Sequence, residues 1–334
     1  MKNIYFLFTL FFSSILTAQI SDFNSTNFTI ADNIAKLNER ENLNNLPILS
    51  YKLTNKLNTD VEKFRAIFYW VCDNIKADDH QNTKIKNSRK KLQNDSLAYI
   101  EWNRQFGKKA LKELLKYKKT TCSGYAYLLK ELCFFANIEC KIINGYGRTI
   151  DENVESLDLA NHSWNAVKLD NKWYLCDATW ASGYSDSKSN FIKEYNNGYF
   201  LSDPNLFAKN HIPFEKKWLL LNDATQINGN IPPIVYGETF KLNINPITPD
   251  KMVVNCKEGD VVTFSFKNLN NKNYNPSLVE LIREKEILYD IYNIQHNNGL
   301  TTFKYRFPKN GNFDVHLKAE NYIIATYIIK VENN

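Results

Sequence analysis

The pattern of apolar and polar positions divides the 334-residue chain into a first part typical of helices and a last part typical of strands. The clearest helix is predicted over residues 60–75, and a capping box formed by Thr59 and Glu62 marks its start. Its apolar residues recur at intervals of three and four: Val61, Phe64, Ile67, Phe68, Val71 and Ile75. This spacing predicts one buried face.

Other helical patterns are weaker. Residues 19–48 are polar and rich in Asn, and Ile30, Ile34 and Leu37 indicate one amphipathic helix there. A helix is predicted over 96–117, and another begins at Cys122. The apolar face of that last helix consists of Tyr125, Leu128, Leu129, Leu132, Cys133 and Ala136. The polar stretch 77–96, with its run of Lys and Arg, is interpreted as a loop or an insertion.

Strands are predicted over 139–146, 163–170 and 172–177. The pair Asp170-Asn171 is a tight-turn signal that joins the last two strands as a hairpin. A two-residue turn there places His162 diagonal to Asp177, still within side-chain reach. One hairpin is therefore expected to bring an imidazole beside a carboxylate.

The pattern of apolar and polar residues changes after these strands. Residues 181–222 are irregular and aromatic, and from residue 226 short alternating strands follow one another with turn residues between them. Such strands are predicted over 239–244, 261–266, 301–307, 313–317 and 322–331. This pattern predicts an all-β, Ig-like sandwich over 226–334.

Composition narrows the class of protein. A hydrophobic fraction of 43% with 14% aromatic residues supplies packed cores and excludes global disorder. The formal charge of +6 is small for this length, and the basic clusters at 84–91 and 116–120 are interpreted as solvated faces. We therefore expect no nucleic-acid partner.

Residues 1–18 are typical of a secretory signal peptide. Lys2 precedes an apolar run over 4–12, and small residues lead to a cleavage site near Ala18. That run is too short for a transmembrane helix, and no later run approaches the ~20 residues needed. We expect export to the periplasm or the extracellular space, without stable membrane insertion.

Six cysteines occur in the chain: Cys72, Cys122, Cys133, Cys140, Cys176 and Cys256. No two of them have the spacing of a zinc-binding pair, and the five histidines do not cluster with them. The apolar surroundings of most of these residues are typical of cysteine in a core. We expect no obligatory disulfide, no metal and no cofactor.

Three of the polar residues suggest chemistry. Cys122 stands at the first turn of a predicted helix, where the helix dipole favours a thiolate. His162 and Asp177 follow it, and a thiol, an imidazole and a carboxylate are the groups that thiolate acyl transfer requires. His211, in the aromatic region, is expected to be structural rather than catalytic.

Three segments around these residues resemble the transglutaminase-like superfamily, and specifically its bacterial, kyphoscoliosis-peptidase-like branch. They read TCSGYA at 121–126, NHSWNAV at 161–167 and WYLCDATW at 173–180. The segments YFLSDP at 199–204 and HIPFEKKW at 211–218 also resemble that branch. The resemblance covers about residues 49–222.

The resemblance implies an α+β fold. A papain-like core over 49–225, with helices packed on an antiparallel sheet, follows a lead-in over 19–48 and precedes the sandwich domain. It implies Cys122 as nucleophile, His162 as base and Asp177 as orienting acid. Ala178 stands where the family often has Pro, and no acidic loop matches the calcium sites of animal transglutaminases.

Because the fold does not fix the reaction, several functions stay open. Hydrolysis of peptide or amide bonds in a protein, a peptide or a cell-wall peptide is favoured over protein cross-linking, since water is always present and no amine-binding feature is visible. The alternatives are a non-catalytic cell-surface binding module and a structural role for each of the three residues.

Overall fold

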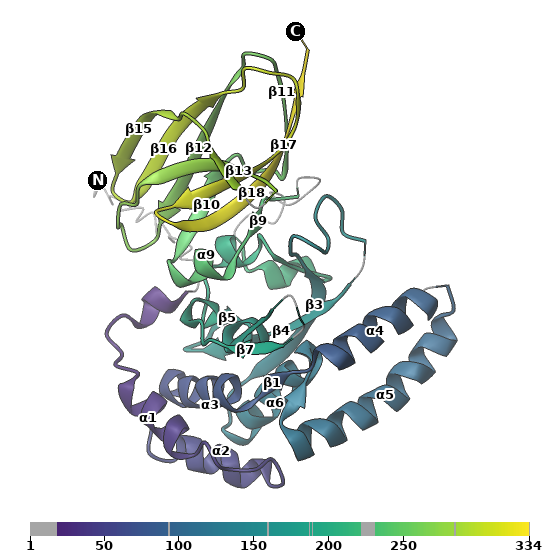
Figure 1. Ribbon diagram of the computed structural model, residues 1–334. Helices are drawn as coiled ribbons and strands as arrows, with labels where there is room; N and C mark the ends of the chain where they lie inside the picture. Colours follow the sequence, from purple (N-terminus) through teal and green to yellow (C-terminus); the bar gives the residue numbers. More distant parts are fainter. Residues whose placement is uncertain are drawn as a thin grey trace, which may run out of the picture.

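The computed structural model describes residues 19–333, except residues 93, 159, 187, 189, 222–230 and 284. A core of helices and one main sheet precedes a β-sandwich, as Figure 1 shows. The chain therefore has the α+β class with a C-terminal sandwich that the sequence predicts. The expected signal peptide and the expected domain boundary at residue 225 lie outside the described residues.

Helix α3 (Asp60–Asn74) is the centre of the helical layer. Its capping box is confirmed, because the Thr59 side chain accepts from the backbone of Glu62 and the Glu62 carboxylate accepts from the backbone N–H of Thr59. All six apolar residues of the predicted face are buried. Helices α1 (Thr29–Leu37), α2 (Leu46–Thr54) and α6 (Cys122–Phe135) pack around it.

Helix α6 begins at Cys122, as predicted. Its buried side chains lie between α2 and α3 on one side and the sheet on the other. Gly124 allows the side chain of Thr120 to approach closely, because a Cβ at Gly124 would overlap that side chain. The start of α6 is thereby fixed against the strand that precedes it.

The main sheet is antiparallel. Its strand order is β5 (Lys172–Cys176), β4 (His162–Leu169), β3 (Cys140–Gly147) and β8 (His211–Pro213). Residues 170–171 have φ of 46° and 64°, the left-handed values that a type I′ hairpin turn requires. The register pairs Asn165 with Cys176, so His162 is diagonal to Asp177, as predicted.

The interpretation of residues 77–96 as a loop is wrong. They contain helix α4 (Asp79–Leu92), which forms a helical hairpin with α5 (Ser96–Tyr117) that projects from the core (Figure 1). Lys, Arg and Gln are good helix formers, but a helix made mainly of them has no apolar stripe. Such a helix therefore leaves no periodic signal in the sequence. Among the described residues of the two helices, only Gln81 and Leu114 are buried.

Two further predictions need correction. Helix α1 exists, but Ile30 and Leu37 are exposed, and Ala31, Ile34 and Ala35 form its buried face. The strand predicted over 239–244 is instead helix α9 (Gly237–Lys241), which precedes strand β10. Short alternating runs do not separate a strand from a helix when one large side chain decides the packing.

The C-terminal domain consists of two sheets that share one core. One sheet has the order β10 (Ile244–Thr248), β12 (Val261–Asn268), β16 (Leu300–Arg306) and β15 (Tyr292–Asn297). The other has the order β11 (Val253–Lys257), β18 (Tyr322–Glu332), β17 (Gly311–Ala319), β13 (Pro276–Ile282) and β14 (Lys285–Leu288), and β9 (Ile234–Val235) pairs with β18. Buried side chains from both sheets meet between them, among them Phe264, Phe303, Leu317 and Tyr327. The strands predicted near 261, 301, 313 and 322 are confirmed.

Short elements complete the described chain. They are η1 (Ile20–Phe23), β1 (Lys76–Ala77), β2 (Lys119–Thr120), α7 (Ala178–Ser182), β6 (Gly183–Ser185), β7 (Phe191–Lys193), η2 (Asn197–Tyr199), α8 (Pro204–Phe207) and η3 (Lys216–Leu219). None of the described helices is both long enough and apolar enough to cross a bilayer. The six cysteines are free thiols, and all but Cys122 and Cys256 are buried.

Strand β8 lies against β3 only because residue 145 is a glycine. A Cβ at Gly145 would overlap the backbone of Ile212 and Pro213. We expect Gly145→Ala to lower the free energy of unfolding by about 1–3 kcal/mol, the usual cost of overpacking. Urea denaturation measures this change.

Gly107 provides the matched control. It lies inside α5, and a Cβ there would meet nothing within 4 Å. We expect Gly107→Ala to raise the free energy of unfolding by about 0.4–1 kcal/mol. Equal stability of the two variants would contradict the proposed close approach of β3 and β8.

Candidate active site

Cys122 lies at the N-terminus of α6, and its side chain is half-buried. Its Sγ is 3.9 Å from the backbone oxygen of Asn161, which precedes β4. The first backbone N–H groups of a helix have no intrahelical acceptor, so they favour a negative charge nearby. The position therefore suits a thiolate.

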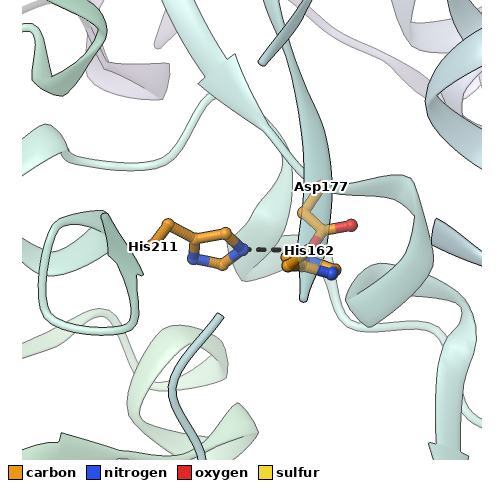
Figure 2. Close-up of side chains that lie close together, drawn as sticks. All are labelled: His162, Asp177 and His211. Carbon is orange, nitrogen blue, oxygen red and sulfur yellow. Dashed lines mark hydrogen bonds and ion pairs between the residues drawn. The ribbon is translucent and has the colours of Figure 1, made fainter. Parts of the chain in front are cut away.

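His162 is the first residue of β4, and its ring is buried. Its Nε2 is 2.6 Å from Oδ2 of Asp177, across the β4–β5 hairpin (Figure 2). Because Nε2 contacts the carboxylate, Nδ1 is the nitrogen that remains for the hydrogen bond between His162 and Cys122. The structure thus brings all three predicted residues together.

The Asp177 carboxylate is fully buried and has hydrogen-bond donors on both oxygens. Asp177 is the N-cap of α7, and its Oδ1 accepts from the backbone of Thr179 at 2.7 Å and of Trp180 at 3.2 Å. Its Oδ2 accepts from His162 and, at 3.0 Å, from Nε2 of a second histidine, His211. Four donors therefore hold one carboxylate in one orientation.

His211 stands at the start of β8 and is buried among aromatic rings. The Phe207 ring stacks on it with centroids 3.8 Å apart, and the Trp180 ring lies 4.5 Å away. Burial lowers the pKa of His211 to about 4, despite the hydrogen bond to Asp177. A neutral His211 with its proton on Nε2 donates to Asp177, while Nδ1 lies 2.6 Å from the side-chain amide of Asn210.

Charge is separated between Cys122 and His162. Burial opposes ionisation of the Cys122 thiol, but the hydrogen bond and charge of His162 outweigh it and lower the pKa of Cys122. Burial would lower the pKa of His162, but the charge and hydrogen bond of Asp177, with a contribution from Cys122, raise it to about 10. Both shifts favour a thiolate beside an imidazolium.

The carboxylate itself stays ionised. Burial alone would raise the pKa of Asp177, but His162 and then His211 hold it well below its ordinary value. A buried carboxylate that accepts several hydrogen bonds is a strong acid for this reason. Asp177 can therefore orient the His162 ring without taking its proton.

His162, Asp177 and His211 also form a cluster of potential metal ligands among the described residues, with their ligand atoms within 4.8 Å of one another. Nε2 of His162 and Nε2 of His211 are already hydrogen-bonded to Oδ2 of Asp177. A cation at the centre would have to replace both hydrogen bonds and would sit beside an imidazolium. The arrangement fits an orienting network better than a metal site.

A cavity of about 300 Å³ gives access to Cys122 and His162. We call it the catalytic pocket. Helix α4 supplies one wall with Asp79, Asn82, Lys86 and Arg89, and Trp180, whose ring stacks on His162 at 4.8 Å, supplies another. The other lining residues include Thr121, Thr149, Glu152 and Asn161.

The sequence predicts Cys122, His162 and Asp177 but not the hydrogen bond between His211 and Asp177. His211 was expected to be structural, and it does not line the catalytic pocket. The segment that contains it was part of the family resemblance, but only the pairing of β8 with β3 brings the ring to Asp177. A long-range strand pairing of this kind has no local signature.

Comparison with known proteins places the site in a family. Residues 48–178 match the model of the transglutaminase-like superfamily. Kyphoscoliosis peptidase of Homo sapiens is 35% identical over 172 residues, which are 51% of this chain and 23% of that protein. The Mus musculus protein of the same name is 33% identical over 174 residues, again 51% and 23%. Hillarin of Drosophila melanogaster is 26% identical over 208 residues, 58% of this chain and 23% of that protein.

The chain thus spans about a quarter of the length of these curated relatives. Among solved structures, the Lin-41 filamin domain covers 30% of this chain and 97% of its own, with 8% identity and a TM-score of 0.21. The I81 domain of titin covers 27% and 97%, with 12% identity and a TM-score of 0.20.

The family model covers the segment that contains Cys122, His162 and Asp177, and the two peptidases match half of the chain. Membership supports cysteine-dependent acyl transfer as the general chemistry. Residues 48–178 are a domain of the transglutaminase-like superfamily, in its kyphoscoliosis-peptidase-like branch.

Proposed function

We propose that this protein is a cysteine-dependent amidase or peptidase, in which Cys122 is the nucleophile, His162 the acid and base, and Asp177 the orienting carboxylate. The observation that carries the proposal is the thiol at the start of α6, in one cavity with an imidazole whose Nε2 is 2.6 Å from a buried carboxylate. This is the constellation that cysteine acyl transfer requires.

The reaction follows from the charge-separated pair. The Cys122 thiolate attacks the carbonyl carbon of an amide, and the N–H of Cys122 at the helix start donates to the oxygen that becomes negative. The His162 imidazolium gives its proton to the nitrogen of the leaving amine as the C–N bond breaks. Water then attacks the thioester while His162 takes its proton, which releases the acid and restores the thiolate.

We assign His211 a positioning function. Its neutral ring donates to the same oxygen of Asp177 that His162 contacts, so it restricts the carboxylate to the orientation that His162 needs. It lies behind the carboxylate rather than in the catalytic pocket. Groups that orient a catalytic or ligating side chain in this way commonly affect activity without contact to substrate.

Charges in the catalytic pocket support water as the acyl acceptor. A lysine amine that entered the pocket would meet two cations, Lys86 and Arg89 on α4, as well as the carboxylates of Asp79 and Glu152, so these four groups present no net negative charge to attract it. The Glu152 carboxylate, which could hold an ammonium group, is already paired with Lys86 at 2.7 Å and accepts from Asn161. We therefore propose hydrolysis rather than cross-linking.

We also propose that the substrate is a protein, a peptide or a cell-wall peptide outside the cytoplasm. The support is the signal-peptide pattern of residues 1–18 and the size of the catalytic pocket, which lies at the lower end of the ~300–1,000 Å³ usual for ligand sites. A pocket of this size admits one side chain or a few backbone groups at a time.

The first test is alkylation by iodoacetamide across pH, followed by peptide mass spectrometry. Because His162 lowers the pKa of Cys122, we expect Cys122 to react at its full rate well below the ordinary thiol pKa of about 8.5. In His162→Ala the imidazolium is lost while the burial remains, so the midpoint should move above about 8.5.

Cys256 is the internal control. It is half-buried like Cys122, but burial raises its pKa, so it should react only at alkaline pH in both proteins. Titration of Cys122 together with Cys256 would contradict the thiolate–imidazolium pair.

The positioning function of His211 is tested with two variants. His211→Ala removes a hydrogen bond to a buried charge, which is worth about 1.5–3 kcal/mol, so alkylation of Cys122 at pH 7 should slow about tenfold to a hundredfold. His211→Gln keeps an N–H donor and should recover much of the rate. Equal rates for the two variants, both correctly folded by circular dichroism, would make His211 merely structural.

Hydrolysis is tested by the products. Incubation with peptides and a fluorescent amine should give new amino termini or ammonia and no labelled product, and His162→Ala should lower the rate by about 10²–10⁴. Efficient incorporation of the amine would replace hydrolysis by transfer. Absence of any turnover by a protein whose Cys122 is activated would contradict hydrolysis and favour a binding function.

A further inference from the structure

A second cavity, of about 620 Å³, adjoins the catalytic pocket. The two cavities share several lining residues, which are Ala77, Asp79, Asn82, Thr149, Thr179 and Trp180. Because one set of residues lines both, the cavities lie side by side, and a chain laid over these shared residues reaches from one to the other. We call the larger one the junction pocket.

The far wall of the junction pocket comes from the C-terminal part of the chain. Strand β9 and helix α9 supply Ile234, Val235, Tyr236, Gly237 and Lys241. Figure 1 shows α9 between the sandwich and the core. The junction pocket therefore includes residues outside the segment that matches the family model.

This wall is firmly attached to the core. The Phe240 ring is buried and stacks on Tyr199 with centroids 4.2 Å apart. A Cβ at Gly198 would overlap the backbone of Phe240, so only glycine permits this contact. Thr239 then donates to the backbone oxygen of Ile324 at 2.7 Å, which joins α9 to the sandwich. The junction pocket is a built cavity rather than a gap between separate domains.

Each charged group that lines the junction pocket already has a polar partner, and Asp79 accepts from the hydroxyl of Ser185. Lys241 pairs with Glu194 at 3.0 Å and with Glu238 at 3.4 Å. The Arg148 guanidinium donates to three backbone oxygens and is buried. No ionic ligand is favoured by these groups, since each charge already has partners.

The apolar side chains of the pocket, in contrast, are available. Ile150 is 59% exposed and Tyr184 is 55% exposed, and both line the cavity. Phe191, Tyr236 and Trp180 line it as well. Trp180 also stacks on His162, so a group bound in the junction pocket contacts the ring that covers the catalytic imidazole.

We propose that the junction pocket is a subsite for a large apolar or aromatic side chain of a polypeptide substrate, and that the C-terminal β domain thereby supplies part of the substrate-binding surface. The proposal rests on the proposed amide hydrolysis at Cys122. The occupant is an extended peptide, because one continuous chain laid over the shared residues reaches both Cys122 and α9.

The test uses a library of end-blocked octapeptides. Peptides that the wild-type protein cleaves should carry Phe, Tyr, Trp, Leu or Ile at one fixed distance from the scissile bond, with kcat/KM at least about tenfold above peptides with Gly there. In Ile150→Ser/Tyr184→Ser this preference should disappear, so that the apolar peptides are cleaved no faster than the Gly peptides. Both residues are exposed, so the variant is expected to fold.

Leu288→Ser/Tyr292→Ser is the matched control. It makes the same two kinds of change at exposed positions of the sandwich that line neither pocket, and it should keep the preference. Cleavage without any apolar preference, or a preference that survives in Ile150→Ser/Tyr184→Ser, would overturn the subsite.

A binding measurement separates this proposal from the proposed reaction. Cys122→Ala cannot form the thioester, so peptides that it retains on a filter report binding alone. Retention of apolar peptides that is lost with Ile150→Ser/Tyr184→Ser, together with no cleavage by the wild-type protein, would keep the subsite and overturn the hydrolysis. Cleavage by the wild-type protein without selective retention would keep the hydrolysis and overturn the subsite.

Discussion

The buried carboxylate of Asp177 is the group on which the rest of the site depends. An isolated charge in this position would be very costly, and four hydrogen bonds offset the cost. Thr179 and Trp180 hold one oxygen from the start of α7, and His162 and His211 hold the other from β4 and β8. One anion therefore links α7, β4 and β8, so the packing of the sheet also sets the geometry of the site.

The two imidazoles on that carboxylate are in different states for a physical reason. One negative charge stabilises one neighbouring cation well, and a second cation at the same oxygen would be repelled by the first. His162 has another anion within reach, the thiolate of Cys122, whereas His211 is enclosed by aromatic rings. These surroundings therefore favour the positive charge on His162, and His211 remains a neutral donor.

Local chemistry made much of the fold predictable. The capping box at Thr59, the apolar spacing over 60–75 and the turn at 170–171 each act within a few residues. The turn alone places His162 diagonal to Asp177. These features depend on neighbours in sequence, so they can be predicted without knowledge of the tertiary structure.

The features that were not predicted depend on contacts distant in sequence. His211 reaches Asp177 only through the pairing of β8 with β3. Residues 239–241 are helical because Phe240 fills a site against Tyr199, although the sequence alternates like a strand. Helix α4 lacks the apolar stripe by which helices are found. The domain boundaries and the catalytic roles of the three residues stay predictions.

The weak attachment of α4 affects how the sequence of the protein can change. Helix α4 forms one wall of the catalytic pocket, yet it is joined to the rest of the protein mainly through polar contacts such as Lys86 with Glu152 and Arg89 with the backbone of Ala160. Substitutions on its pocket-facing side exchange solvated side chains and leave the hydrophobic core intact. Selectivity near Cys122 can therefore diverge by mutation at little cost to stability, while the network around Asp177 tolerates no such drift.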